Sequence, residues 1–176
     1  MKYLLDANIC TYVMRHQPAV VAARFKSLKV GDACMSIITF AELRAGIERL
    51  TTTRAHDERV LDLFLQQIPV LPFDEAAART YGVLRAAVPE RRKNALDRLI
   101  AAHAVCVEAT LVTNNEADFK GYPGLVVENW ALAAGRQRAW FAPARRTAPP
   151  ASTGVHSAKV SDARCHHVAH ASAQPT

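Results

Sequence analysis

The sequence lacks any run of eighteen or more apolar residues, so it predicts no transmembrane helix. We also expect no signal peptide, because the acidic residue Asp6 comes too early for the apolar segment that such a peptide needs. No two of its four cysteines stand in a C-x-x-C spacing, which argues against a disulfide framework. Together these absences predict a cytoplasmic protein whose thiols act as small apolar side chains.

The length and composition are those of one globular domain. The chain has 176 residues, of which 50% are hydrophobic and 22% charged, and this excludes a wholly disordered or collagen-like protein. Its net charge of +6 is unevenly distributed. Residues 1–130 carry 16 Lys and Arg against 15 Asp and Glu, whereas residues 131–176 carry 6 against 1. The basic balance therefore belongs to the C-terminal part and says little about the function of the rest.

Residues 1–130 alternate short apolar runs with longer helical ones. The expected strands are Lys2 to Leu5, Ala33 to Ile37, Ile68 to Leu71, Thr110 to Val112 and Leu125 to Val127. The expected helices are Asn8 to Arg15, Ala19 to Leu28, Ala41 to Leu50, Asp57 to Gln67, Glu75 to Val88 and Ala95 to Glu108. This alternation predicts an α/β fold with a parallel sheet covered on both faces. Ligands of such sheets bind at the carboxyl ends of the strands.

The composition changes after Trp130. Residues 131–176 form an extension rich in Ala, Arg, Pro, Ser and His, in which a short helix could persist to about Phe141. We expect residues 142–176 to be disordered or a non-native addition. Cys165, His166, His167 and His170 could bind a metal, but no surrounding fold is expected to fix their geometry.

Acidic residues follow two of the expected strands. Asp6 ends the first strand, where it could also cap the helix that begins at Asn8. Glu42 follows the second strand, in a Thr39-x-x-Glu42 pattern that is typical of a capping box without any chemical role. That pattern also predicts that Glu42 lies in the first turn of a helix at the carboxyl end of the strand.

Two further acids are expected near the same edge. Asp97 shares a helix face with apolar Ile100, Ala101 and Ala104, where an unpaired carboxylate is costly to bury. Relief from the helix dipole is partial, so we expect a metal ion or a basic partner, and Arg98 points elsewhere. Asp118 follows the fourth expected strand in a polar loop, where Glu116 competes with it and turn formation is the simpler explanation.

Several carboxylates at one edge repel one another and raise one another's pKa, and a divalent cation removes that penalty. Oxygen ligands suit Mg²⁺ or Mn²⁺. Such a metal neutralises a phosphate group and lowers the pKa of a bound water, so the cluster is suited to phosphodiester cleavage.

Four sequence blocks resemble the PIN-domain ribonucleases, particularly the VapC toxins of bacterial toxin–antitoxin pairs. They are YLLDANI at 3–9, SIITFAELRAG at 36–46, ALDRLIAAHA at 95–104, and a fourth block with LVTNN at 111–115, DF at 118–119 and PGLVVENW at 123–130. The blocks occur in the family's order and span residues 1–130. The resemblance implies a three-layer α/β/α domain with a central parallel sheet of about five strands.

The resemblance also implies a site and its partners. Asp6, Glu42, Asp97 and Asp118 match the acids that hold Mg²⁺ or Mn²⁺, and Asn8, Thr113 and Asn115 match supporting polar positions. The implied activity is cleavage of RNA, often tRNA, and close relatives act at the anticodon stem-loop of initiator tRNA. The implied partner is a VapB-type antitoxin, which binds operator DNA, and the implied assembly is a homodimer within a toxin–antitoxin complex.

The sequence departs from the family in a few places. Ala7 stands where Thr is commoner, and the loop before Asp97 is shorter than usual. Within that loop Arg91, Arg92 and Lys93 are candidate RNA-binding residues, although a solvated basic loop would look the same. Residues 131–176 are outside the family pattern.

The sequence bears on three alternative functions. A metal-free ribonuclease needs a pair of histidines, but none is suggested by the spacing, and His103 is expected to be a partly buried packing residue. A phosphoacceptor receiver domain needs paired acids after its first strand and a Lys after its fifth, and the sequence has neither. A catalytically idle PIN-fold binding module is the remaining alternative, against which the four retained acids argue.

Overall fold

A computed structural model describes residues 1–88 and 95–132. The candidate RNA-binding residues Arg91, Arg92 and Lys93 lie outside these ranges, as does the expected extension from residue 133 onward, with its candidate metal cluster around Cys165.

Five parallel strands form one sheet in the order β3-β2-β1-β4-β5. Their bounds are β1 (Tyr3–Leu5), β2 (Ala33–Ser36), β3 (Val70–Leu71), β4 (Thr110–Val112) and β5 (Val127–Glu128). The strands are short, and β1 and its neighbour β4 are mostly apolar, as expected for a sheet buried on both faces. Because β1 lies between β2 and β4, the residue that follows it stands at the middle of the carboxyl edge.

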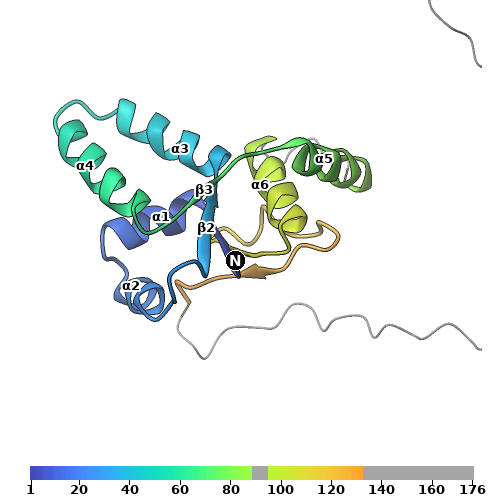
Figure 1. Ribbon diagram of the computed structural model, residues 1–176, viewed down its shortest axis with the longest axis horizontal. Coiled ribbons are helices and arrows are strands. Elements are labelled where there is room, and N and C mark those ends of the chain that lie inside the picture. The colour runs from blue at the N-terminus through green and yellow to red at the C-terminus, as the bar shows by residue number, and fades with distance from the viewer. Residues whose placement is uncertain (89–94, 133–176) are drawn as a thin grey trace, which may run out of the picture. The chain divides into compact units, whose positions relative to one another are not determined.

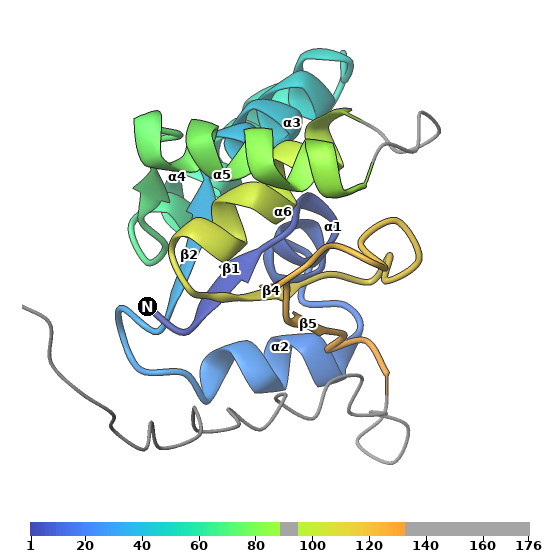
Figure 2. The same cartoon turned by 90° about the vertical axis from the view of Figure 1, so that its right-hand side faces the viewer.

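Helices cover both faces of the sheet. They are α1 (Ala7–Met14), α2 (Ala19–Lys26), α3 (Ile37–Glu48), α4 (Arg54–Leu65), α5 (Glu75–Ala87) and α6 (Ala95–Cys106). Figure 1 shows α1 to α4 on one side of the strands and α5 and α6 on the other. In Figure 2, turned by 90°, α5 and α6 lie in front of β1 and β2. The expected three-layer α/β/α architecture is confirmed.

Alternating side chains divide the core between the two faces. Leu5, Met35 and Val112 pack with α1 to α4, whereas Leu4, Cys34 and Leu111 pack with α5 and α6. Successive side chains of a strand point to opposite faces. Two neighbouring apolar residues of one strand, such as Leu4 and Leu5, therefore pack into different halves of the core. All six of these strand side chains are fully buried.

One helix begins earlier than the sequence predicted. The sequence predicted a helix from Ala41, but the corresponding helix α3 starts at Ile37. The strand before it was predicted to reach Ile37 and instead ends at Ser36. The hydroxyl of Ser36 accepts a hydrogen bond from Ile38 N at 3.1 Å and caps the helix. The predicted capping box at Thr39 is therefore wrong, since Thr39 is fully buried inside the helix. The other boundaries differ by a few residues.

Within residues 1–88 and 95–132, the helices are all too short or too polar to cross a lipid bilayer.

Candidate functional site

Four polar residues stand side by side at the carboxyl edge of the sheet. Leu5 of β1 pairs with Met35 of β2 and Val112 of β4, and Val112 pairs with Glu128 of β5. The next residue on each strand is therefore at one level across the edge: these residues are Ser36, Asp6, Thr113 and Asn129. All four are buried, with exposed fractions from 0 to 7%. Buried polar groups require hydrogen-bond partners, and the row supplies several of its own.

Asp6 lies at the centre of this row and is held on both of its oxygens. Oδ1 accepts a hydrogen bond from Ala7 N at 2.8 Å, which makes Asp6 the N-cap of α1 as the sequence suggested. Oδ2 accepts hydrogen bonds from Asn8 Nδ2 at 2.9 Å and from the Thr113 hydroxyl at 2.7 Å. Burial raises the pKa of Asp6 while these hydrogen bonds lower it, and the net direction is upward. The carboxylate is thus oriented rigidly and costly to keep charged.

The expected supporting residues form the surroundings of that carboxylate. Asn8 also donates to the Thr113 hydroxyl at 3.1 Å and accepts from Asn114 N at 3.0 Å. The Thr113 hydroxyl accepts from Asn115 N at 3.0 Å. The Asn115 side-chain amide donates to the Asp118 carboxylate. These contacts connect two of the expected acids through the loop after β4.

Glu42 lies further along α3 than expected, because the helix begins at Ile37 rather than near Ala41. The expectation that it lies in the first turn is therefore wrong, yet Glu42 still interacts electrostatically with Asp6 and Asp97. Burial raises the pKa of Glu42 to about 7, and repulsion from Asp6 and Asp97 contributes. A carboxyl group with that pKa is partly protonated at neutral pH when no cation is near.

Asp97 occupies the first turn of α6, as expected. Burial raises its pKa to about 6, and repulsion from Asp118 and Asp6 adds to this effect. Its same-face neighbours Ile100 and Ala101 are fully buried. Arg98 is buried and interacts with Tyr122.

The structure distinguishes the two acids of the loop after β4. Asp118 is partly buried and raises the pKa of both Asp6 and Asp97 by its charge. Glu116 is exposed and accepts a hydrogen bond from Asn129 Nδ2 at 2.9 Å. Of the two candidates, Asp118 is the one that belongs to the acidic neighbourhood.

Charges within this set of four acids affect the pKa values of Asp6, Glu42 and Asp97, but the four side chains are not arranged around a common metal position. Within residues 1–88 and 95–132, no three His, Cys, Asp or Glu side chains have the arrangement of a formed metal site. The oxygen donors and raised pKa values of these acids fit a hard divalent cation, which would stabilise the charged forms that burial disfavours.

Sequence reasoning missed one buried pair in this region. His103 was expected to be a partly buried packing residue, but only 1% of it is exposed. Its Nδ1 lies 2.9 Å from the Ser36 hydroxyl. Burial lowers the pKa of His103. The signal in the sequence was Ser36 itself, a polar residue at the end of an apolar strand. Asn129, which ends β5 in the same way, was likewise given no role.

Comparisons with known proteins agree with this architecture. The PIN domain family matches residues 3–125. Ribonuclease VapC2 of Rickettsia felis is 35% identical over 133 residues, which cover 74% of this chain and 98% of that protein. The tRNA(fMet)-specific endonuclease VapC of Shigella flexneri is also 35% identical, over 74% of this chain and 99% of its own length.

A solved structure of a similar protein has the same fold. The crystal structure of VapBC2 from Rickettsia felis, bound to a DNA fragment from its promoter, contains a chain that is 33% identical to this one. That similarity covers 74% of this chain and 99% of the other, with a TM-score of 0.68. PIN-domain nucleases in general depend on divalent metal ions. The protein belongs to the PIN-domain family and, within it, to the VapC toxins, which are endoribonucleases.

Proposed function

We propose that Asp6, Glu42, Asp97 and Asp118 bind Mg²⁺ or Mn²⁺ and that the protein cleaves RNA at this site. The observation that carries the proposal is the raised pKa of two of these acids, about 7 for Glu42 and about 6 for Asp97, to which burial contributes most and the charges of the neighbouring acids add. Carboxyl groups whose pKa values are raised by burial together with neighbouring charges are concentrated at functional sites.

Each residue has a definite part in this proposal. Asp6 is the anchor, because its hydrogen bonds to Thr113 and Asn8 fix its orientation before anything binds. Glu42 and Asp97 approach from α3 and α6, and Asp118 is oriented by Asn115. A bound divalent cation supplies neutralisation of the phosphate charge and acidifies a water molecule.

We propose tRNA as the substrate class, with the anticodon stem-loop of initiator tRNA as the first target to test. Support comes from the Shigella flexneri relative, which is named a tRNA(fMet)-specific endonuclease. Arg91, Arg92 and Lys93 precede Asp97 in the chain and are proposed to contact the phosphate backbone of the RNA.

Purified protein incubated with total tRNA should produce discrete fragments in Mg²⁺ or Mn²⁺ and none in EDTA, because the repelling carboxylates need a cation to act together. Gel analysis and sequencing of the fragment ends identify the cleaved tRNA. Metal-dependent cleavage confined to another RNA would overturn the tRNA assignment alone. Cleavage that persists in EDTA would contradict the metal site.

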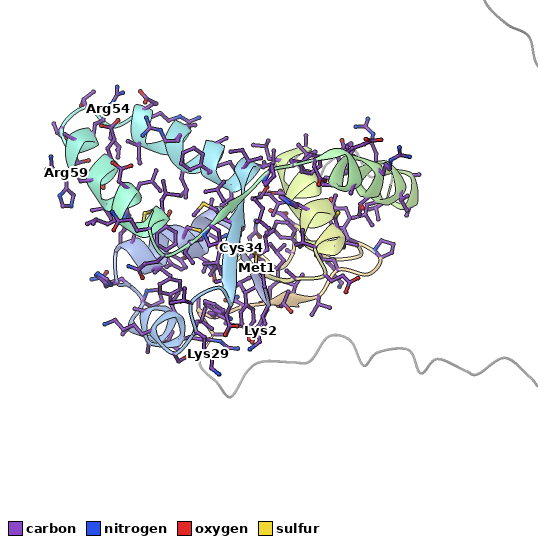
Figure 3. All side chains as sticks on the ribbon, viewed as in Figure 1. Met1, Lys2, Lys29, Cys34, Arg54 and Arg59 are labelled. Carbon is purple, nitrogen blue, oxygen red and sulfur yellow. The ribbon has the colours of Figure 1, made fainter. Side chains whose placement is uncertain are left out.

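We propose a VapB-type antitoxin as the binding partner, since the similar structure is of a VapBC complex. A hollow of about 650 Å³ lies among α1, α2, α4 and the segment after α2, and it is lined by apolar Phe25, Leu28 and Phe64 with Lys26 and Lys29. Figure 3 labels Lys29, which follows α2. The basic residues that line the hollow favour binding of an acidic amphipathic segment. They disfavour binding of the chain's own basic residues 131–176.

Leu63→Glu should weaken binding of the cognate antitoxin by about tenfold or more, since this side chain is 60% exposed and lines the hollow. Val83→Glu is a matched control, because Val83 is 68% exposed on α5, which does not line the hollow. Calorimetric titration of each variant with antitoxin makes the comparison. Equal affinities for the two variants would show that the antitoxin binds elsewhere.

A further inference from the structure

A buried hydrogen bond joins the two helices that carry Glu42 and Asp97. The Ser36 hydroxyl and His103 Nδ1 are 2.9 Å apart, and these residues are 0% and 1% exposed. Ser36 ends β2 and caps α3, whereas His103 lies on α6. The helices α3 and α6 also pack against each other.

The bond lies close to both acids along the chain. Glu42 follows Ser36 by six residues on α3, and Asp97 precedes His103 by six residues on α6. Six residues correspond to about 9 Å of helix axis, within which a helix is nearly rigid. The repulsion that raises the pKa of Glu42 includes Asp97, so the two helices bring these carboxylates near each other. A shift of one helix against the other would therefore change their separation.

A histidine is an unexpected choice for this position if packing is its only role. Its neighbours Ala101, Ala102 and Ala104 are fully buried and apolar, and burial disfavours the charged imidazole. The ring is held on a second side by an edge-on contact with Phe73, at 5.5 Å between ring centroids. A buried polar pair of this kind permits one alignment, whereas apolar side chains tolerate sliding.

We propose that His103 is a positioning residue for the metal site: its hydrogen bond to Ser36 sets α3 against α6 and so fixes Glu42 relative to Asp97. This inference rests on the proposed function, because it requires that these acids bind a cation. His103 contacts neither substrate nor metal in this role. It acts through the helix N-terminus that Ser36 caps.

The test measures Mn²⁺ affinity by calorimetric titration of the purified full chain without RNA. His103→Phe keeps a ring of similar size but removes the hydrogen bond, and it should weaken Mn²⁺ binding about tenfold, as loss of an outer partner of a metal site typically does. His103→Asn places an amide nitrogen near the position of Nδ1 and should restore affinity to within about threefold of wild type. Ser36→Ala removes the same bond from the other side, together with the cap on Ile38 N, and should weaken Mn²⁺ binding at least as much as His103→Phe.

Two controls separate positioning from stability. Val21→Ala truncates a fully buried side chain on α2 and should lower the melting temperature without changing Mn²⁺ affinity. In a Glu42→Gln background, His103→Phe should cause no further loss of affinity, because the residue through which it acts has been removed. A structural role alone would give a loss that is independent of Glu42.

The outcomes distinguish this inference from the proposed function. Wild-type Mn²⁺ binding with unchanged affinity in His103→Phe and Ser36→Ala would overturn the positioning role and leave the metal site intact. Absence of Mn²⁺ binding in the wild type would overturn both. If His103→Phe does not fold, Ser36→Ala decides between the same results.

Discussion

Asp6→Asn should reduce RNA cleavage by at least about a hundredfold, because it removes the charge of the central acid of the site. The substitution is nearly isosteric, and the Asn oxygen can still accept the hydrogen bond from Ala7 N that caps α1. The second oxygen is replaced by an amide that cannot accept the bonds from Asn8 and Thr113. The measurement is the single-turnover cleavage rate at saturating Mg²⁺.

The fold should survive this change. Removal of a carboxylate whose pKa is raised by burial relieves a cost, which offsets the lost hydrogen bonds. We therefore expect the metal-free variant to be at least as stable as the wild type in urea unfolding. Asp62→Asn is the control, since this acid is exposed on α4. A destabilised Asp6→Asn protein that still cleaves RNA would refute the assignment of Asp6.

The Glu42→Gln/Asp97→Asn double variant should be more stable than the wild type at pH 7.5 without metal, by about 2 kcal/mol. Folding raises the pKa of Glu42 from 4.5 to about 7 and of Asp97 from 3.8 to about 6. One pKa unit corresponds to about 1.4 kcal/mol, and solvent screening at these partly exposed positions reduces the sum to about 2 kcal/mol.

The sign of the pH dependence follows from the direction of the two shifts. The folded state binds these protons more tightly than the unfolded state, so the wild type loses stability as the pH rises from about 4 to about 7. The double variant lacks this loss, and the two proteins should converge near pH 4. Burial lowers the pKa of His103, which destabilises both proteins in acid and cancels in the comparison.

Urea unfolding in EDTA at pH 4.5 and pH 7.5 measures this difference. Addition of Mn²⁺ at pH 7.5 should stabilise the wild type and not the double variant, because a ligand stabilises only the state that binds it. A stability advantage of equal size at both pH values would show that folding does not raise the pKa of these two acids. Asp62→Asn serves again as the exposed control.

Most of the fold could be predicted from local patterns. Apolar triplets such as Tyr3 to Leu5 and Thr110 to Val112 predicted strands, and the intervening helical segments predicted parallel pairing. The carboxyl ends of parallel strands share one edge, so the convergence of Asp6 with the loop after β4 followed without coordinates.

The start of α3 could not be read correctly in the same way. Ser36 and Thr39 are both good capping residues, and the second makes a capping box with Glu42 in the sequence. Tertiary burial decided between them. Ser36 pairs with Leu71 in the sheet and caps the helix, whereas Thr39 is buried within it.

The sequence by itself predicted that acids follow strands at one edge of a parallel sheet, because the alternation of strands and helices dictates where strands end. Only the tertiary structure placed Asp118 where its charge raises the pKa of Asp6 and of Asp97, and brought His103 against Ser36 across 67 residues of chain. The physical reason is the separation along the chain of the residues that interact. Strand and helix patterns depend on neighbouring residues, whereas electrostatic repulsion and buried hydrogen bonds depend on which side chains the packed helices bring together.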